Sequence, residues 1–231
     1  SENDHLIVCI SWTYGSGGVN IGFKLADKLK INFYDAEIFE AVLKRLEAQK
    51  DSIQDSVSYG IKPGIKKEPA HDQDANVNPS EAFIPERHLT LRQRMREFSR
   101  FHGLPKRDAV FFNESDLLVD MAKKEDFVIL GRCGDAIMAN NNIPHISIYI
   151  TAPFEQRIKR AMEIDSSLTV KQARHMLKHL DHVHSQYYHY YTNRNWGHSN
   201  NYDLCINSAS YGIDGTVDFI YRMITAREED K

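Results

Sequence analysis

The sequence predicts a three-layer α/β fold with a five-stranded parallel sheet covered by helices on both faces. Two observations carry this prediction: short apolar runs alternate with longer helical patterns, and a glycine-rich segment follows the first apolar run. Nearly continuous apolar runs are typical of strands buried on both faces. The predicted strands are Leu6 to Ile10, Asn32 to Tyr34, Phe127 to Leu130, His145 to Ile150 and Tyr202 to Ile206.

The segments between these strands have helical periodicity. Pro153 supports one of the helix starts, because its missing N–H would be unpaired in the first turn anyway. The predicted helices are Val19 to Lys30, Ala36 to Gln49, Glu86 to Arg100, Lys106 to Lys123, Asp135 to Asn140, Pro153 to Ile164, Thr169 to Tyr191 and Gly212 to Glu228.

One segment does not follow the alternation. Asp51 to Pro85 holds four of the seven prolines and many polar residues. A structureless connection of this length is unusual inside a compact domain, so residues 51–85 are predicted to form a flexible arm. At 231 residues the whole chain suits one domain with this interruption.

Charge and cysteine usage narrow the functional classes. A formal net charge of −3 provides no overall attraction to nucleic acid or to an anionic membrane, and the longest apolar runs are far shorter than the roughly 20 residues of a membrane span. Cys9, Cys133 and Cys205 show no Cys-x-x-Cys spacing. We therefore predict a cytoplasmic protein that contacts neither nucleic acid nor membrane.

The glycine-rich segment after the first strand predicts a phosphate site. A strand, a tight turn and a helix start direct several backbone N–H groups and the positive end of a helix dipole at one point. A plain strand-to-helix turn is the alternative, but its place at the carboxyl end of a parallel strand favours ligand binding. The candidate residues are Tyr14, Gly15, Ser16, Gly17, Gly18, Val19 and Asn20.

This segment lacks the lysine of a complete phosphate-binding loop. In the pattern Gly-x-x-x-x-Gly-Lys-Ser/Thr the lysine reaches the terminal phosphates and the hydroxyl binds magnesium. With Gly17 as the second glycine, Gly18 stands at the lysine position and Val19 at the hydroxyl position, and a register shifted by one residue gives Val19 and Asn20. Neither register restores the positive charge. Lys24 is about 9 Å further along the helix axis, so it cannot simply bend back to the loop.

Arginines flank two of the predicted strands. Arg132 follows the strand that ends at Leu130, which places it at the carboxyl edge of the sheet, where ligands bind. Its guanidinium suits phosphate recognition, and an ion pair with Asp135 is the alternative. Arg157 and Arg160 share one helix face, which by itself would be a solvated surface.

Two further clusters have less specific patterns. Arg92, Arg96 and Arg100 form one helical stripe, interpreted as a solvated or subunit-facing surface. The segment 175–198 holds six of the eleven histidines. His175 and His179 have a spacing that can hold a metal, but no third ligand has the expected spacing nearby, so no metal site is predicted.

Several of these residues together resemble the cytidylate kinase-like family of P-loop proteins. The similarity covers nearly the whole chain except residues 51–85. It is carried by Tyr14-Gly-Ser-Gly-Gly18, Phe33-Tyr34-Asp35, Val128-Ile-Leu-Gly-Arg132, Arg157-Ile-Lys-Arg160, Trp196-Gly197 and Asn201-Tyr-Asp-Leu-Cys-Ile-Asn207.

The resemblance implies a P-loop NTPase fold of the nucleoside monophosphate kinase type, with transfer of the ATP γ-phosphoryl group in the presence of Mg²⁺. CMP or dCMP would be the acceptor by family default. It implies an acceptor-side insertion over residues 36–115 and a lid-like segment over 157–197. Donor phosphates would lie on Gly15 to Gly18, with Asp35 and Arg132 at the acceptor. Arg157, Arg160, His184 and Arg194 would belong to the lid. The catalytic residues would be Arg132, Arg157 and Arg160.

The chain also departs from the family pattern at charged positions. Val19 and Ala36 stand where relatives commonly carry basic residues, and His184 lies close to a lid arginine position. Loss of one preorganised charge-stabilising group typically costs 10²- to 10³-fold in rate. Three hypotheses follow: an active kinase, a degenerate P-loop module that binds a nucleotide or other anion, and an oligomeric scaffold. An incomplete site also suggests a homodimer.

Overall fold

The computed structural model describes residues 5–36, 115–131 and 133–229. These residues belong to a unit that comprises residues 1–36 and 115–231. Several predictions lie outside the described residues: the arm over 51–85, the helices over 36–49 and 86–100 apart from residue 36, the arginine stripe, and Arg132.

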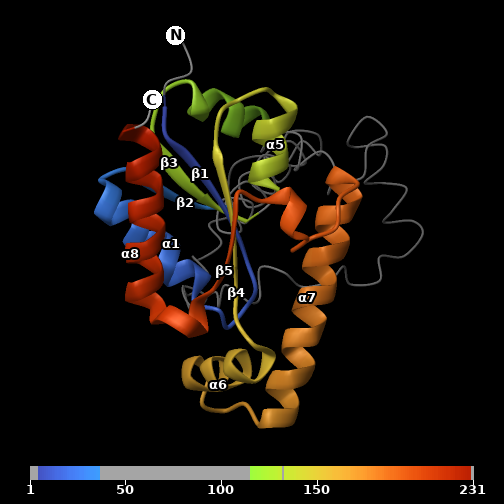
Figure 1. Ribbon diagram of the computed structural model, residues 1–231. Helices are drawn as coiled ribbons and strands as arrows, with labels where there is room; N and C mark the ends of the chain where they lie inside the picture. The colour runs from blue at the N-terminus through green and yellow to red at the C-terminus, as the bar shows by residue number, and fades with distance from the viewer. Residues whose placement is uncertain (1–4, 37–114, 132, 230–231) are drawn as a thin grey trace, which may run out of the picture. The chain divides into compact units, whose positions relative to one another are not determined.

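The five-stranded parallel sheet is confirmed, with the order β2-β3-β1-β4-β5 (Figure 1). Every neighbouring pair is parallel, so the carboxyl ends of all the strands lie along one edge. The strands are β1 Ile7–Trp12, β2 Asn32–Asp35, β3 Phe127–Leu130, β4 Ile146–Thr151 and β5 Leu204–Asn207.

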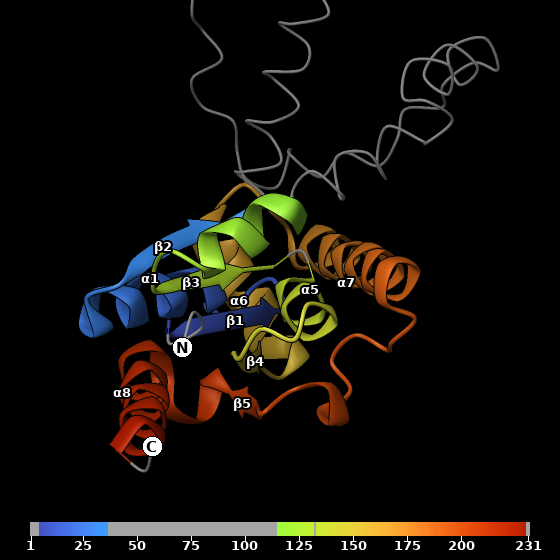
Figure 2. The ribbon, with the colours of Figure 1, turned by 90° about the horizontal axis from the view of Figure 1, so that it is seen from above.

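Helices cover both faces of the sheet, as Figure 2 shows from above. One face carries α1 (Gly18–Leu29) and α8 (Ser208–Glu229). The other face carries α5 (Gly134–Asn140) and α7 (Val170–Thr192). The helix α6 (Phe154–Ile164) follows β4 at the carboxyl edge, η1 (Ser199–Asn201) precedes β5, and residues 115–122 are also helical.

Two apolar clusters hold these layers together. The larger joins the sheet to α1 and α8 through fully buried residues such as Val8, Ile21 and Ile220. The smaller lies between α6 and α7 and consists of Ile158, Ala161, Ala173 and Leu177. Because the second cluster is separate from the main core, α6 and α7 pack as a pair beside the carboxyl edge of the sheet.

A local sequence signal explains the start of α7. Thr169 and Gln172 form a capping box at the start of α7, with the Thr169 Oγ1 accepting from the Gln172 N–H at 3.3 Å. The predicted start of the last helix at Gly212 differs from the structure, because residues 208–211 are already helical. Gly212 interrupts α8 with a φ of 69°, which suits glycine.

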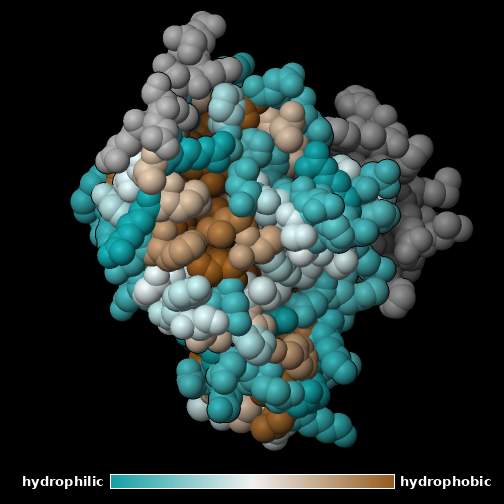
Figure 3. All heavy atoms as spheres, viewed as in Figure 1, coloured by the Kyte–Doolittle hydropathy of each residue, from teal (hydrophilic) through white to brown (hydrophobic). Residues whose placement is uncertain are grey.

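The outer surface is mostly hydrophilic in the view of Figure 3, with an apolar area near the centre, over β4, β5 and α8. Leu204 of the edge strand β5 and Met223 of α8 are partly buried against the main core. Tyr211 and Phe219 of α8 stack with ring centroids 5.8 Å apart and stay exposed. Among the described helices, none combines the length and the apolar character that a membrane crossing requires.

Candidate functional site

The glycine loop connects the end of β1 at Trp12 to the start of α1 at Gly18. Gly15 and Gly17 have φ values of 81° and 80°, in the left-handed region that glycine adopts without a steric penalty. Both the backbone N–H and the Oγ of Ser16 donate to the Thr13 carbonyl, at 3.0 and 2.6 Å. The loop is therefore tightly wound, and the unpaired N–H groups of the first turn of α1 open beside it.

Neighbouring elements fix this loop from two sides. The Ser208 hydroxyl, at the start of α8, donates to the Ser16 carbonyl at 2.6 Å. On the other side, a Cβ at Gly15 would lie 2.6 Å from the backbone carbonyl oxygen of Arg157 in α6. Real side chains do not approach a carbonyl so closely, so only glycine allows α6 to pack directly on the loop.

The position of the missing lysine is sterically closed. A Cβ built at Gly18 would overlap the Cβ and Cγ atoms of Trp12. Trp12 is the last residue of β1 and packs against the main core. The nearest of these atoms is the Cβ, so in this backbone conformation any residue other than glycine at position 12 would close the position.

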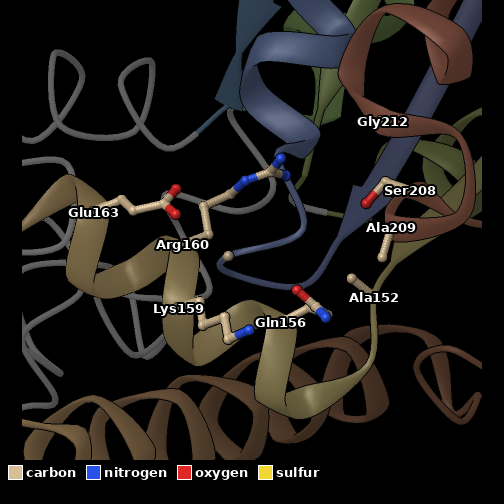
Figure 4. A pocket seen from close by; sticks show the side chains of 9 residues that line it. Ala152, Gln156, Lys159, Arg160, Glu163, Ser208, Ala209 and Gly212 are labelled. Atoms are coloured by element: carbon tan, nitrogen blue, oxygen red, sulfur yellow. The ribbon is translucent and has the colours of Figure 1, made fainter.

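Positive charge reaches the loop from α6 instead. A Cβ at Gly17 would collide with Nη1 of Arg160, so this guanidinium lies directly against the Gly17 backbone. Figure 4 shows Arg160 reaching from α6 toward the start of α1. The described residues offer it no carboxylate within ion-pair distance, although Glu163 lies one helical turn away. An arginine that lies beside a glycine loop and pairs with none of the described carboxylates is suited to bind an anion.

A pocket of about 200 Å³ opens beside this guanidinium (Figure 4). Lys159 and Arg160 of α6 give one side of the pocket positive charge. Small, uncharged residues at the start of α8, Ser208, Ala209 and Gly212, form the other side. Its lining residues are Gly15, Ala152, Gln156, Lys159, Arg160, Glu163, Ser208, Ala209 and Gly212. The pocket thus joins one end of the glycine loop to a space between α6 and α8.

Arg157 lies on the same helix as Arg160 but is used differently. Its Nε donates to the Tyr14 carbonyl at 2.8 Å. Its Nη1 and Nη2 donate to the two carboxylate oxygens of Asp181 in α7, at 2.9 and 2.7 Å. The side chain is 6% exposed, so this predicted lid arginine is a buried link between α6, the loop and α7.

The other predicted site residues are spread over the sheet edge and α7. Val19 and Asn20 are exposed in the first turn of α1. Asp35 is the last residue of β2, paired in register with Leu130. His184 packs edge-on against Trp196 at 5.6 Å between ring centroids.

Arg194 follows α7, where its backbone N–H donates to the Thr192 hydroxyl at 3.0 Å. Burial raises the pKa of Asp135, and Arg194 lies close enough to that carboxyl group for its charge to oppose the rise. The structure therefore brings Arg157 and Arg160 to the glycine loop, while Arg194 faces α5.

A buried polar network also anchors α7 to α5. The Tyr188 hydroxyl donates to Asp135 Oδ2 at 2.7 Å, and Asp135 is 3% exposed. Burial raises the pKa of Asp135, although the bond from Tyr188 opposes this shift. Burial also raises the pKa of Tyr202, to about 12, and Tyr202 is hydrogen-bonded to Tyr188 and Ser11. The network extends from α5 to β1.

The loop residues fit a polyphosphate better than they fit a metal ion. Ser16 is fully buried and its hydroxyl is bound to the Thr13 carbonyl, so it is not placed as a Mg²⁺ ligand. Val19 has no ligand atom, which leaves the exposed amide of Asn20 as the candidate oxygen in the loop. Within the described ranges no group of three or more His, Cys, Asp and Glu side chains could hold a metal.

Sequence reasoning missed several residues that shape this site. Ser208 follows β5 directly, so its place at a carboxyl end could have revealed it. Trp12, Asp181 and Lys159 had no such signal, because their roles depend on how α6 and α7 meet the loop. No sequence spacing relates Arg157 to a carboxylate 24 residues later in the chain.

Comparison with known proteins decides the ancestry of this arrangement. The model of a family described as "Cytidylate kinase-like family" matches residues 7–210. The chain belongs to the cytidylate kinase-like family. The match spans all five strands and the glycine loop, so it includes both sides of the candidate site. A comparison with curated proteins finds no match.

Solved structures show the same fold at low sequence identity. An uncharacterized protein from Eubacterium ventriosum is 22% identical, with a TM-score of 0.64, over 96% of this chain and 99% of that chain. Shikimate kinase from Bacteroides thetaiotaomicron is 11% identical, with a TM-score of 0.50, over 95% and 98% of the two chains. These likenesses show a kinase-like fold for this member of the family.

Proposed function

We propose that this protein is a cytidylate kinase-like phosphotransferase that uses Arg160 in place of the loop lysine. The donor is ATP with Mg²⁺, and the acceptor is a nucleoside monophosphate, CMP or dCMP by family default, or a similar small acceptor. The observation that carries the proposal is the position of the Arg160 guanidinium. It lies against Gly17, beside a pocket that Gly15 also lines.

The described residues suggest a division of tasks. The N–H groups at the start of α1 and the turn at Gly17 hold the donor phosphates. The nucleoside part of the donor fits the pocket between α6 and α8, where Gln156 and the small residues at Ser208 and Ala209 form the walls. Arg160 neutralises the charge that develops on the transferred group, which is the main task of a protein in phosphoryl transfer.

The acceptor side rests on the family resemblance and remains a proposal. Asp35, at the carboxyl end of β2, and Arg132 would contact the acceptor there. The insertion over 36–115 would complete that side, and the segment 157–197 would cover the donor side. Arg132→Ala is expected to lower phosphoryl transfer sharply, and unchanged activity in that variant would remove Arg132 from the mechanism.

The test is a coupled assay for ADP formation from ATP with a panel of nucleoside monophosphates, with and without chelation of Mg²⁺. In the active protein, Arg160→Met is expected to lower kcat/KM by about 10²- to 10³-fold, because it removes one charge-stabilising donor. Arg222→Met is the matched control, since Arg222 is exposed on α8 and lies outside the pocket lining.

The second candidate function is a catalytically degenerate module that binds a nucleotide or another anion. The closed lysine position, where Trp12 fills the space above Gly18, favours this candidate. Calorimetry distinguishes the two. Saturable binding of ATP without turnover on any acceptor supports the degenerate module, whereas Mg²⁺-dependent turnover excludes it. Absence of binding by ATP, CMP and phosphate contradicts both.

A further inference from the structure

The Arg157 side chain links three elements that are far apart in sequence. It starts on α6, bonds the backbone of the glycine loop at Tyr14, and forms a two-bond ion pair with Asp181 on α7. We call these three residues the loop strut. The guanidinium is almost fully enclosed, with 6% of the side chain exposed, while Asp181 is 30% exposed.

The bonding of this guanidinium is specific. A carboxylate that accepts from both Nη atoms fixes the plane of the group, because the fork geometry of arginine matches it. Fixing that plane points Nε at the Tyr14 carbonyl, 2.8 Å away. Asp181 therefore sets the direction of a bond that holds the first residue of the glycine loop.

The backbone contacts give the strut a second consequence. Gly15 packs on the Arg157 carbonyl so closely that a Cβ would not fit, so the loop and α6 have no free space between them. The paired helices α6 and α7 also share their own apolar cluster. A displacement of α6 and α7 from the loop would break the Tyr14 bond or separate Arg157 from Asp181.

We infer that Arg157 is a positioning residue, held by Asp181, that fixes the conformation of the glycine loop. In this role Arg157 ties α6, and through Asp181 also α7, to the glycine loop. The inference rests on the proposed function in one respect, that the loop is the phosphate site. It assigns the two arginines of α6 different tasks, since Arg160 meets the anion and Arg157 shapes the loop that receives it.

The sharpest test is Asp181→Asn, because Asp181 bonds neither the loop nor any residue in the lining of the pocket. Amide hydrogen exchange at residues 15–18 is expected to accelerate at least tenfold, while exchange in β1 stays within twofold. The Kd for ATP, measured by calorimetry, is expected to rise about tenfold. Loop exchange and Kd both within twofold of the original protein would overturn the inference.

Glu155→Gln is the matched control. Glu155 pairs with Arg174 at 2.8 Å and so joins the same two helices, but through an exposed contact that does not reach the loop. This variant is expected to change loop exchange and ATP affinity by less than twofold. An effect equal to that of Asp181→Asn would show that any contact between α6 and α7 matters, which contradicts a specific strut.

A double variant covers the case in which Asp181→Asn leaves a buried cation unpaired and fails to fold. Arg157→Met with Asp181→Leu removes both charges, a replacement that buried ion pairs often tolerate. This variant is expected to fold and still to show fast exchange in the loop. Retained protection of residues 15–18 in a folded double variant would overturn the inference.

The exchange measurement also separates this inference from the proposed function. If the original protein binds no ATP, the proposed function fails, but accelerated loop exchange in Asp181→Asn still confirms the strut. If ATP binds and is turned over while loop exchange is insensitive to Asp181, the strut fails and the proposed function stands.

Discussion

The two sides of the glycine loop differ in whether a positively charged side chain contacts them. On the inner side, the Trp12 side chain covers Gly18, the position where a complete phosphate-binding loop carries its lysine. On the outer side, Arg160 reaches in from α6 and lies against Gly17, next to an open pocket. At Gly18 an apolar contact with Trp12 stands where the motif has a cation. At Gly17 a cation is present, but it comes from α6 and not from the loop itself.

This difference shows that a missing motif residue does not by itself mean a missing charge. The lysine of the motif belongs to the loop, so it stays with the loop in every conformation. Arg160 belongs to α6, so its charge is at the loop only while α6 stays packed on Gly15. Arg157 and Asp181 keep α6 in that position. The loop strut therefore also determines whether the Arg160 guanidinium lies at the loop.

The largest expected effect comes from restoring the lysine. Gly18→Lys alone forces a Cβ into Trp12, and we expect a loss of about 3 kcal/mol in the free energy of unfolding, measured by urea denaturation, as for other overpacked sites. Trp12→Gly removes the clash but also removes a side chain that packs on the main core, so we expect the loss in the Trp12→Gly, Gly18→Lys double variant to be smaller than the sum of the two single losses. Additive losses in the double variant would show that the two positions are not coupled.

A smaller effect is expected on the outer side of the loop. Gly17→Ala places a side chain at a φ of 80° and pushes the Arg160 guanidinium away. We expect a stability loss of about 1–2 kcal/mol from the backbone conformation and a roughly tenfold weaker binding of ATP by calorimetry. Gly131→Ala, at a φ of 84° and with none of the described atoms within 4 Å of the added Cβ, controls for the backbone cost. Unchanged ATP affinity in Gly17→Ala would separate Arg160 from the phosphate site.

The free energy of unfolding is expected to depend on pH through Asp135 of α5, which accepts a hydrogen bond from Tyr188 of α7. The pKa of Asp135 is raised by burial, so its contribution to stability is fully present below the ordinary pKa of aspartate and is lost as pH rises through the folded-state value. Asp135→Asn cannot titrate, so its stability relative to the original protein should increase over that pH range. Urea midpoints measured at a series of pH values check this. A constant difference between the two proteins across the series would contradict it.

The smallest effect is expected at Lys24, the nearest lysine after the loop. Its Nζ is bonded to Asp214 of α8 at 2.6 Å, and both side chains are more than half exposed. Lys24→Met should therefore lower stability by no more than about 0.5 kcal/mol and leave ATP affinity within twofold. A tenfold loss of ATP affinity would mean that Lys24 of α1 contributes positive charge at the loop in addition to Arg160.

Much of the fold could be predicted from sequence because its signals are local. The short apolar run at Phe127–Leu130 predicts a buried strand, and its predicted bounds are confirmed. The β4 and β5 bounds differ by one or two residues, since strand ends depend on pairing with neighbours. The start of α8 was harder to predict from the sequence. Residues 208–211 form a helical turn before Gly212, and Ser208 at its start bonds the glycine loop, which is a contact between distant parts of the chain.

The candidate site was predictable only in part. The glycine loop follows from the position of its motif on an α/β sheet. The place of Arg160 beside it was implied only by the family resemblance, because the spacing of Arg157 and Arg160 by itself indicates a solvated helix face. The use of Arg157 did not follow, because a guanidinium near a phosphate and a guanidinium in an ion pair have the same sequence pattern. The partner that separates the two, Asp181, is distant in the chain and adjacent only when α6 packs on α7.

The sequence by itself determined the parallel sheet, the loop at its carboxyl edge and the family, because periodicity, glycine placement and motif order are written along the chain. Only the tertiary structure decided which charges meet the loop. Trp12 closes one side of it, Arg160 approaches the other, and Arg157 is bound to Asp181. Each of these contacts joins residues from separate elements, and their distances exist only after the helices pack.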